Sequence, residues 1–359
     1  MRLFFIGLIN LFGWSSGLAF TPMWPGSLNQ YPESLAASTN QSRAAIEPDF
    51  GSSFPKFQIH NPEIIWTAKT NYLQKPLWIY KAMPQIFPRS VISNLMSLGS
   101  LTIQDERTEG KINPWLLTEP LSFANKSNTC SLFIVPVDGQ IQYWNGSAFP
   151  NHWDKIKHLV EPAVGVPNDA KIEKLGLKFL KQFGIRQDDL AQKANGNLLT
   201  FGEKRTRSYF DRRRGKYIDD EVIARGIFFN RRIDGINFAG IGIDEGCEIM
   251  YGNNAKMAVF RLVWRNLQRY QQCRIANSDE IISYIRDGQA VMTHKNLVNP
   301  ADIKKLTITD CSPLYMGADG DETQDFVCPF AQVEAIADLG YTNVDIQLYC
   351  PILSTNRFY

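Results

Sequence analysis

The stretch that most constrains the fold covers residues 169–264, where one helical pattern is followed by several alternating apolar segments. Asn168 can cap this helix and Gly184 can end it. Its apolar face consists of Ile172, Leu175, Phe179, Leu180 and Phe183. Strands are predicted over residues 226–233, 236–241, 247–251 and 257–264, with Asp234-Gly235 as the first turn. We expect an antiparallel meander whose apolar face is covered by the helix.

The same order of a helix followed by strands recurs on both sides of this stretch. Before it, a helix that ends at Gly99 precedes a hairpin around Asp138-Gly139. After it, a helix over residues 277–288 precedes strand patterns at 305–309, 313–316, 325–335 and 344–352. The recurrence predicts an α+β fold of tandem helix-on-antiparallel-sheet modules.

This order gives a predicted domain organisation. A signal peptide covers residues 1–19, and an irregular arm rich in Pro, Ser, Asn and Gln covers 20–62. A first α+β lobe covers 63–150, a central helix-plus-meander lobe covers 160–272, and a C-terminal α+β lobe covers 273–359.

The beginning of the chain predicts secretion. Met1 and Arg2 give a positive start, residues 3–14 are apolar, and Gly17 and Ala19 are small residues before a cleavage point. The alternative is an uncleaved anchor, but the apolar run is shorter than the roughly 20 residues that span a bilayer. We therefore expect a protein of the extracellular space or the secretory-pathway lumen, with no stable membrane insertion after cleavage.

Six cysteines predict disulfide bonds in an oxidising compartment: Cys130, Cys247, Cys273, Cys311, Cys328 and Cys350. Metal binding is the alternative, but the spacing of a zinc site is missing. Cys311 and Cys328 flank a predicted hairpin, which makes them candidate partners. Three Asn-x-Ser sequons, at Asn40, Asn125 and Asn145, predict glycosylated surface loops if the host glycosylates proteins.

The net charge of +2 excludes no class of partner, but the charge is locally concentrated. Between residues 204 and 216 lie the basic residues Lys204, Arg205, Arg207, Arg212, Arg213, Arg214 and Lys216. Such a run is most often a solvated loop or exposed hairpin. Two alternatives remain open: a surface for phosphate, nucleic acid or acidic glycan, and a site for basic-pair processing proteases.

Few residues suggest catalysis. The four histidines, His60, His152, His158 and His294, lack the spacing that places two metal ligands on one helical face. The acidic turn that contains Asp319 and Asp321 lacks the spacing of an EF-hand loop. No dinucleotide or nucleophile motif is present. We expect neither a metal nor a cofactor.

Asp244, Glu245 and Glu248 are the candidate catalytic carboxylates, because a curled sheet could enclose them as acid and base. In a strand, Asp244 and Glu248 would share one face and Glu245 the other. The competing expectation, which we favour, is that all three are solvent-facing charges at turns and strand edges.

Several segments carry a family resemblance. They are Arg232-Ile233-Asp234-Gly235, Val263-Trp264-Arg265, the helix at 278–288 and Phe326-Val327-Cys328-Pro329. Over about residues 77–353 the chain resembles secreted proteins built of tandem PepSY-like, cystatin-like modules, including regulators of the YycH and YycI type. The resemblance implies repeated helix-on-sheet modules that act by protein contact or inhibition. The chain differs from those regulators in its six cysteines and in lacking an anchoring helix, so their membrane signalling role is not carried over.

These observations favour a secreted, noncatalytic interaction, inhibitory or regulatory protein. Its expected partner is another secreted protein, and nucleic acid is not expected. The alternative is a nonredox enzyme of the secretory pathway, such as an isomerase, cyclase or hydrolase, that uses carboxylates in a sheet cavity. That alternative requires a pocket in which at least two ionisable groups converge.

Overall fold

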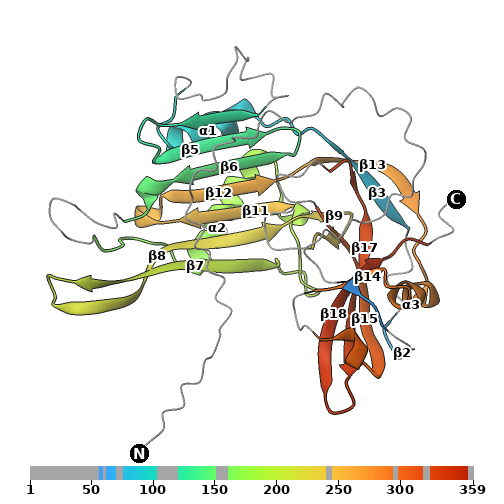
Figure 1. Ribbon diagram of the computed structural model, residues 1–359. Helices are drawn as coiled ribbons and strands as arrows, with labels where there is room; N and C mark the ends of the chain where they lie inside the picture. The colour runs from blue at the N-terminus through green and yellow to red at the C-terminus, as the bar shows by residue number, and fades with distance from the viewer. Residues whose placement is uncertain are drawn as a thin grey trace, which may run out of the picture. The chain divides into compact units, whose positions relative to one another are not determined.

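The computed structural model describes residues 56–59, 62–69, 76–102, 120–150, 161–239, 245–293, 298–317 and 324–354. All of them belong to one compact unit that covers residues 46–359. The described residues are mostly strand and include α-helices α1 Arg89–Leu98, α2 Asp169–Leu180 and α3 Ser278–Arg286 (Figure 1). They form an α+β fold, as predicted. The predicted signal peptide and most of the predicted arm lie outside the described residues.

The first large sheet has the antiparallel strand order β4-β5-β6-β12-β11-β8-β7. Its strands are β4 Leu121–Ala124, β5 Cys130–Val135, β6 Gln140–Asn145, β7 Thr200–Asp211, β8 Lys216–Asn230, β11 Gly246–Tyr251 and β12 Met257–Val263. The hairpin of β5 and β6 turns at Asp138-Gly139, as the sequence predicts.

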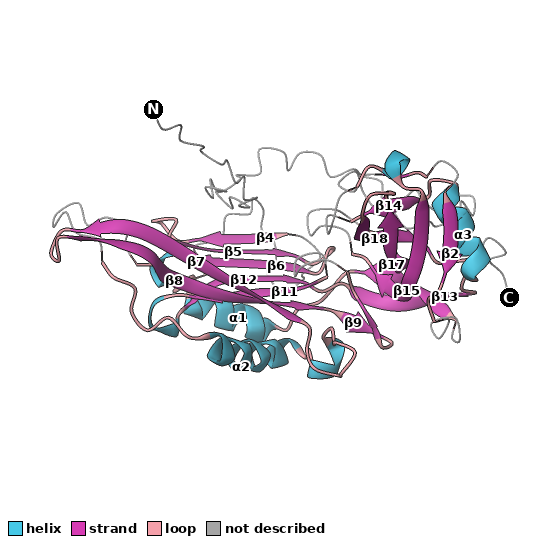
Figure 2. Ribbon diagram, turned by 90° about the horizontal axis from the view of Figure 1, so that it is seen from below, coloured by secondary structure: helices cyan, strands magenta, loops and turns pink. Residues whose placement is uncertain are grey.

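Helices α1 and α2 cover the same face of this sheet (Figure 2). Phe179 of α2 meets Phe260 of β12 edge to face, with ring centroids 4.9 Å apart. Gly176 allows α2 to approach the sheet closely, because a Cβ there would lie 2.9 Å from the Phe229 ring. The buried residues of the two helices are Val91, Ile92, Leu95, Met96, Ile172, Gly176, Phe179 and Leu180. Burial of these apolar side chains is the main force that holds the helices to the sheet.

The second large sheet has the order β1-β14-β18-β17-β15-β2. All its pairs are antiparallel except the parallel pair of β2 and β15. Its strands are β1 Lys56–Phe57, β2 Glu63–Trp66, β14 Ala290–Met292, β15 Lys305–Tyr315, β17 Pro329–Asp338 and β18 Asn343–Pro351. Helix α3 shares a core with this sheet, and its Tyr284 donates a hydrogen bond to the carbonyl oxygen of Leu353 at 2.6 Å.

Two smaller groups of strands complete the described fold. One is a three-stranded sheet in the order β13-β3-β16, with bounds β3 Leu77–Met83, β13 Asn266–Cys273 and β16 Phe326–Val327. The other is a hairpin of β9 Arg232–Ile233 and β10 Ile236–Asn237. A small core joins Tyr80, Phe238, Tyr315 and Val327 from these and neighbouring segments.

The structure differs from the expectation of separate first and central lobes. Strand β6, from the predicted first lobe, pairs with β12, from the predicted central lobe, so that both lobes contribute to one sheet. Strand β3, also from the predicted first lobe, pairs with β13 instead. Both pairings join segments far apart in the chain, and a local pattern cannot specify them.

The predicted meander and arm also differ in part. Strand β8 pairs directly with β11, and the Asp234-Gly235 hairpin lies outside that sheet. At the end of the predicted irregular arm, Phe57 is fully buried and pairs with Ala290 of β14. The two strand patterns predicted at 305–309 and 313–316 are one continuous strand, β15.

Candidate functional site

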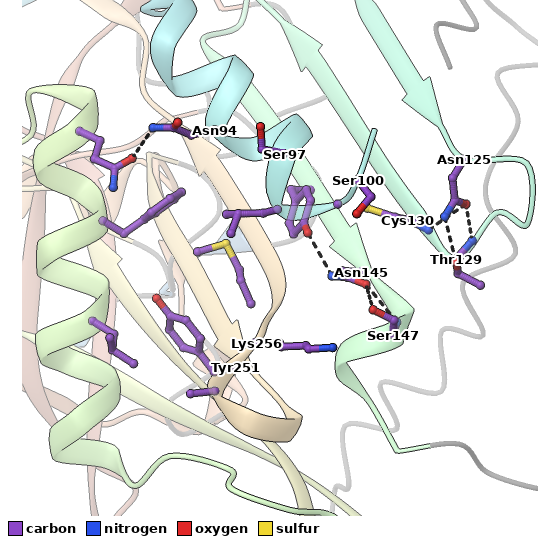
Figure 3. Close-up of a pocket in the computed structure, with 18 of the residues that line it drawn as sticks. Asn94, Ser97, Ser100, Asn125, Thr129, Cys130, Asn145, Ser147, Tyr251 and Lys256 are labelled. Atoms are coloured by element: carbon purple, nitrogen blue, oxygen red, sulfur yellow. Dashed lines mark hydrogen bonds between the residues drawn. The ribbon is translucent and has the colours of Figure 1, made fainter. Parts of the chain in front are cut away.

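An open groove of about 870 Å³ lies between α1, α2 and one end of the seven-stranded sheet (Figure 3). The helices contribute Asn94 and Ser97 from α1 and Lys178 from α2. The strands and their connections contribute Thr129, Asn145 and Lys256, among others. The groove therefore combines amide and hydroxyl groups with apolar surface from the helix-covered core.

The end of α1 forms one wall of the groove. The helix ends at Gly99, where an added Cβ would lie only 2.3 Å from the Sγ atom of Cys130. Ser100 then adopts a left-handed backbone conformation with φ of 52°. The absence of a side chain at position 99 thus allows the helix end to lie against β5.

Hydrogen bonds fix the polar side chains on the strand side. Asn145 Oδ1 accepts from the amide and hydroxyl of Ser147 at 3.0 and 2.7 Å, and its Nδ2 donates to the Tyr143 hydroxyl at 3.2 Å. Asn125 Oδ1 accepts from the Thr129 amide at 2.8 Å, and its Nδ2 donates to the Thr129 hydroxyl at 2.9 Å. These asparagines are therefore held in defined orientations (Figure 3).

Both asparagines belong to predicted sequons, but only Asn145, the last residue of β6, differs from the expected exposed loop, since Asn125 lies in the connection between β4 and β5. Asn145 is 7% exposed, with both ends of its amide hydrogen-bonded. Asn125 is half-buried. Asn40 lies outside the described residues, and glycosylation at all three stays a prediction.

A hydrogen bond links α1 to the turn that follows α2 within the lining of the groove. Nδ2 of Asn94 donates to Oε1 of Gln182 at 3.3 Å. Gln182 lies in the 3₁₀ turn Lys181–Phe183 that extends α2, and that turn ends at the left-handed Gly184 predicted from the sequence.

The ionisable groups of the groove are suited to hydrogen bonding at neutral pH. Burial raises the pKa of the Cys130 thiol to about 11, and burial also raises the pKa of Tyr143 and Tyr251. These groups are therefore protonated at neutral pH. Lys178 and Lys256 are exposed, and no Asp or Glu is among the described residues that line the groove. The arrangement can bind a polar ligand but offers no carboxylate as a general base.

Glu245 is buried, contrary to the expectation of a solvent-facing charge. Its Oε2 accepts from Nη1 of Arg231 at 2.8 Å, and its Oε1 accepts from Nη1 of Arg265 at 3.1 Å. Arg231 also lies over the Trp264 ring, 4.7 Å from its centroid. The three charges form a buried ionic network beside the last residues of β8 and β12 and the first residue of β11. Taking charges out of water is costly, and here the cost is offset only because each has a partner.

Glu248 is also buried, again contrary to expectation, but on the face of the sheet opposite the helices. Its neighbours Cys247 and Ile249 point into the helix-covered core, so alternation directs Glu248 to the other face. There it lies between Arg261 of β12 and Phe228 of β8, with Arg261 Nη1 at 3.6 Å. Desolvation raises the pKa of Glu248 despite the opposing charge of Arg261. Asp244 lies outside the described residues.

A third cluster was not indicated by the sequence. The hydroxyl of Tyr80 donates to Oδ2 of Asp234 at 2.5 Å, and Nη2 of Arg269 donates to Oδ1 of the same carboxylate at 2.8 Å. Desolvation would raise the pKa of Asp234, but the hydrogen bonds from Arg269 and Tyr80 outweigh it and hold the pKa below its ordinary value. The only sequence signal was the Asp-Gly turn, which predicts a conformation and no ionic partner.

All six cysteines are buried, and the structure holds no disulfide among the residues it describes. Cys273, Cys311, Cys328 and Cys350 share the core of the six-stranded sheet. Cys130 and Cys247 lie in the other core, on β5 and β11. Strands β6 and β12 lie between these two strands, which places them roughly 14 Å apart. A disulfide requires Cα atoms within about 7 Å, so these two cysteines are not partners in this fold. Val333, and not Cys328, lies opposite Cys311. Disulfide bonding within the first set stays a prediction.

The basic segment forms the hairpin of β7 and β8 and its turn. Arg205 pairs with Glu203 at 3.3 Å, and Arg207 is buried and pairs with Glu221 at 2.8 Å. The remaining basic residues Lys204, Arg212, Arg213, Arg214 and Lys216 are exposed. The arrangement is an exposed hairpin in which neighbouring carboxylates compensate part of the charge.

The other candidate groups give little further guidance. The four histidines, together with Asp319 and Asp321, lie outside the described residues. Within the part of the chain that the structure describes, no three His, Cys, Asp or Glu side chains gather as a metal site would require. None of the helices in that part has the length and apolar character needed to cross a membrane.

Comparison with known proteins finds similarity only at the level of solved structures. No family model matches it, and no curated protein matches its sequence. Among solved structures, the crystal structure of an uncharacterized protein from Eubacterium rectale is similar, with 13% sequence identity and a TM-score of 0.41. The match covers 83% of this chain and 89% of that chain.

Proposed function

We propose that this protein is a noncatalytic binding protein that acts by contact with another protein, and that the groove beside α1 and α2 is its recognition site. One observation carries the proposal: the groove is lined by neutral hydrogen-bonding groups and two lysines, while the candidate carboxylates Glu245 and Glu248 are held elsewhere beside arginines. An enzyme that used these carboxylates would need them to converge in a cavity.

The groove suits an extended polypeptide segment. Amide and hydroxyl side chains such as Asn94, Ser97 and Thr129 can both donate and accept hydrogen bonds. A peptide backbone offers both kinds of group at every residue except proline. Lys178 and Lys256 are exposed and positively charged, which favours a neutral or acidic segment over a basic one.

The sequence supplies the setting for this contact. The pattern of residues 1–19 supports an extracellular or secretory-lumen protein, and therefore a secreted partner. The resemblance to PepSY-like modules supports action by protein contact. In both large cores, helices pack on sheets whose strands are mostly antiparallel, an arrangement that such modules would also need.

The proposal is tested by site-specific photocrosslinking in the native host. A photoreactive amino acid at Leu98, which lines the groove and is 51% exposed, should crosslink to a protein partner. The same group at Tyr341, in the turn between β17 and β18, provides the control. A second substitution, Ser97→Trp, should place a bulky ring in the groove beside Leu98 and weaken the crosslink from Leu98.

Two results would contradict the proposal. One is the absence of any crosslinked protein when the photoreactive group is at Leu98. The other is a crosslinked partner obtained equally from Leu98 and Tyr341 and unaffected by Ser97→Trp. Because Ser97 is exposed, the Trp variant should fold normally. A melting temperature equal to that of the parent would show that it does.

A further inference from the structure

The hairpin of β7 and β8 continues beyond the sheet that anchors it. Strand β11 pairs with β8 only over residues 225–230, whereas β7 pairs with β8 out to Asp211 and Lys216. Among the residues that the structure describes, no further strand therefore lies beside the outer part of the hairpin, and Figure 1 shows it projecting from the sheet. The turn that joins the strands covers residues 212–215, with Gly215 in the left-handed region.

Ionic and hydrogen bonds stiffen the base of this projection. Nε of Arg207 donates to Glu221 at 2.8 Å across the two strands. The amide of Ala163 also donates to Glu221, at 2.9 Å, which ties the hairpin to a separate segment. Farther out, Ser208 donates to Asp219 at 2.5 Å. These contacts present the tip in a defined position.

The tip combines exposed aromatic rings with positive charge. Phe210 and Tyr217 face each other across the strands and are 55% and 62% exposed. The residues from 211 to 217 include Arg212, Arg213, Arg214 and Lys216 against a single acid, Asp211. Large exposed aromatic side chains beside cations are typical of surfaces that enter the interface of a membrane.

We propose that this hairpin tip binds an anionic lipid surface. The rings of Phe210 and Tyr217 would enter the boundary between headgroups and acyl chains, while the basic residues contact lipid phosphates. The backbone is suited to this position, because the strands are paired up to the turn. Within the turn, the amides of Arg213 and Arg214 donate to Oδ1 of Asp211 at 2.9 and 3.2 Å. The outward-facing backbone groups of a two-stranded ribbon need water, so the backbone would stay at the level of the hydrated headgroups while only the rings reach the acyl chains.

The charge distribution favours a flat surface over an extended polyanion. Asp219 and Asp220 are exposed on the stem of the hairpin, three and four residues from Lys216 along β8. A nucleic acid or glycan chain that followed the hairpin would meet these carboxylates. A surface that touches only the tip would leave them roughly 10 Å away, about one Debye length in physiological salt.

Vesicle flotation tests the proposal. The full chain should float with phosphatidylcholine vesicles that contain phosphatidylglycerol and should stay unbound with phosphatidylcholine alone. Replacing Arg213 and Lys216 together by Gln should weaken binding by about fivefold for each charge removed. Replacing Phe210 and Tyr217 together by Ser should also weaken binding. The matched control replaces an exposed cation and an exposed aromatic elsewhere, Lys193→Gln with Tyr341→Ser, and should bind as the parent does.

Several outcomes would overturn the proposal. They are equal binding to both kinds of vesicle, binding by the tip variants that equals the parent's, and no binding to either vesicle. Retention on heparin or single-stranded DNA that depends on the arginines but not on the aromatic rings would assign the tip to a soluble polyanion instead. Because the tip lies outside both cores, unchanged melting temperatures would exclude misfolding as the cause. The groove variant Ser97→Trp should bind vesicles normally, which separates this proposal from the proposed protein contact.

Discussion

Nη1 of Arg265 lies 3.1 Å from Oε1 of Glu245, and the two side chains are 1% and 0% exposed. Arg231 pairs with the second oxygen of the same carboxylate and donates to the carbonyl oxygen of Arg265 at 2.7 Å. One buried carboxylate thus joins two arginines that follow the ends of different strands. The network fixes these strand ends relative to one another.

Glu245→Gln should strongly destabilise the fold. The change leaves Arg231 and Arg265 buried without the negative charge that compensates them, and breaking a buried ion pair typically costs about 3 to 5 kcal/mol. Urea unfolding at neutral pH measures the loss. Arg269→Gln, which breaks the more exposed pair with Asp234, is the comparison and should cost less. Equal small losses in both variants would contradict a structural role for the Glu245 network.

Tyr80→Phe should show how much Tyr80, as distinct from Arg269, contributes to stability through Asp234. The variant removes one hydrogen bond to a charged group and should lower the free energy of unfolding by about 1.5 to 3 kcal/mol.

Asp234→Asn removes the charge and should also weaken the contact with Arg269. Because the pKa of Asp234 is lowered in the folded chain, its contribution to stability is present above the ordinary carboxyl pKa. That contribution should be lost as the pH falls through the lowered value.

The corresponding measurement is urea unfolding of the parent and Asp234→Asn over a series of acidic pH values. The stability difference between them should shrink as the pH falls. A difference that stayed constant down to the most acidic condition at which the fold persists would contradict the assignment.

Glu248→Gln should stabilise the protein at neutral pH. Burial raises the pKa of Glu248, so ionisation of this carboxyl disfavours the folded state. That penalty is absent below the pKa of a glutamate in the unfolded chain, about 4.3. It is complete above the raised pKa of Glu248 in the folded chain. The stability gain of the variant should therefore disappear as the pH falls to about 4. Glu63→Gln, at an exposed position on β2, is the control. A destabilised Glu248→Gln variant at neutral pH would show that the contact with Arg261 outweighs desolvation.

Gly139→Ala should cost more than an ordinary left-handed glycine substitution. Gly139 has φ of 63°, and a Cβ there would lie 2.6 Å from the carbonyl carbon and oxygen of Trp264. We expect a loss of about 2 to 4 kcal/mol, from the left-handed conformation together with the displaced backbone. Gly196→Ala is the matched control, because Gly196 has φ of 82° and no heavy atom within 4 Å of the added Cβ. The control should lose only about 1 to 2 kcal/mol in urea unfolding.

Helix positions could be predicted because their signals are local. Asn168 accepts from the amide of Lys171 at 3.0 Å, and Asn277 forms a reciprocal cap with Glu280. Each cap involves residues three apart, so the sequence contains the whole interaction. The hairpin at Asp138-Gly139 was predictable for the same reason.

The candidate site could be predicted only in part, because its residues come from segments far apart in the chain. The apolar face of α2 predicted that it would cover a sheet, but the groove also requires the end of α1 and the β5–β6 hairpin. Likewise, charged residues beside a turn are usually solvated, and Glu245 is buried only because Arg231 and Arg265 reach it from other strand ends. No local pattern identifies partners that lie many residues away.

The sequence by itself determined the elements of this protein: which segments are helices, where their caps and turns lie, and which faces are apolar. These properties depend on backbone conformation and on neighbours within a few residues. Only the tertiary structure decided that β6 pairs with β12, that Glu245 and Glu248 are held beside arginines, and that Phe210 and Tyr217 lie at a projecting basic tip. Strand pairing and burial join distant residues, and their free energies depend on the assembled core.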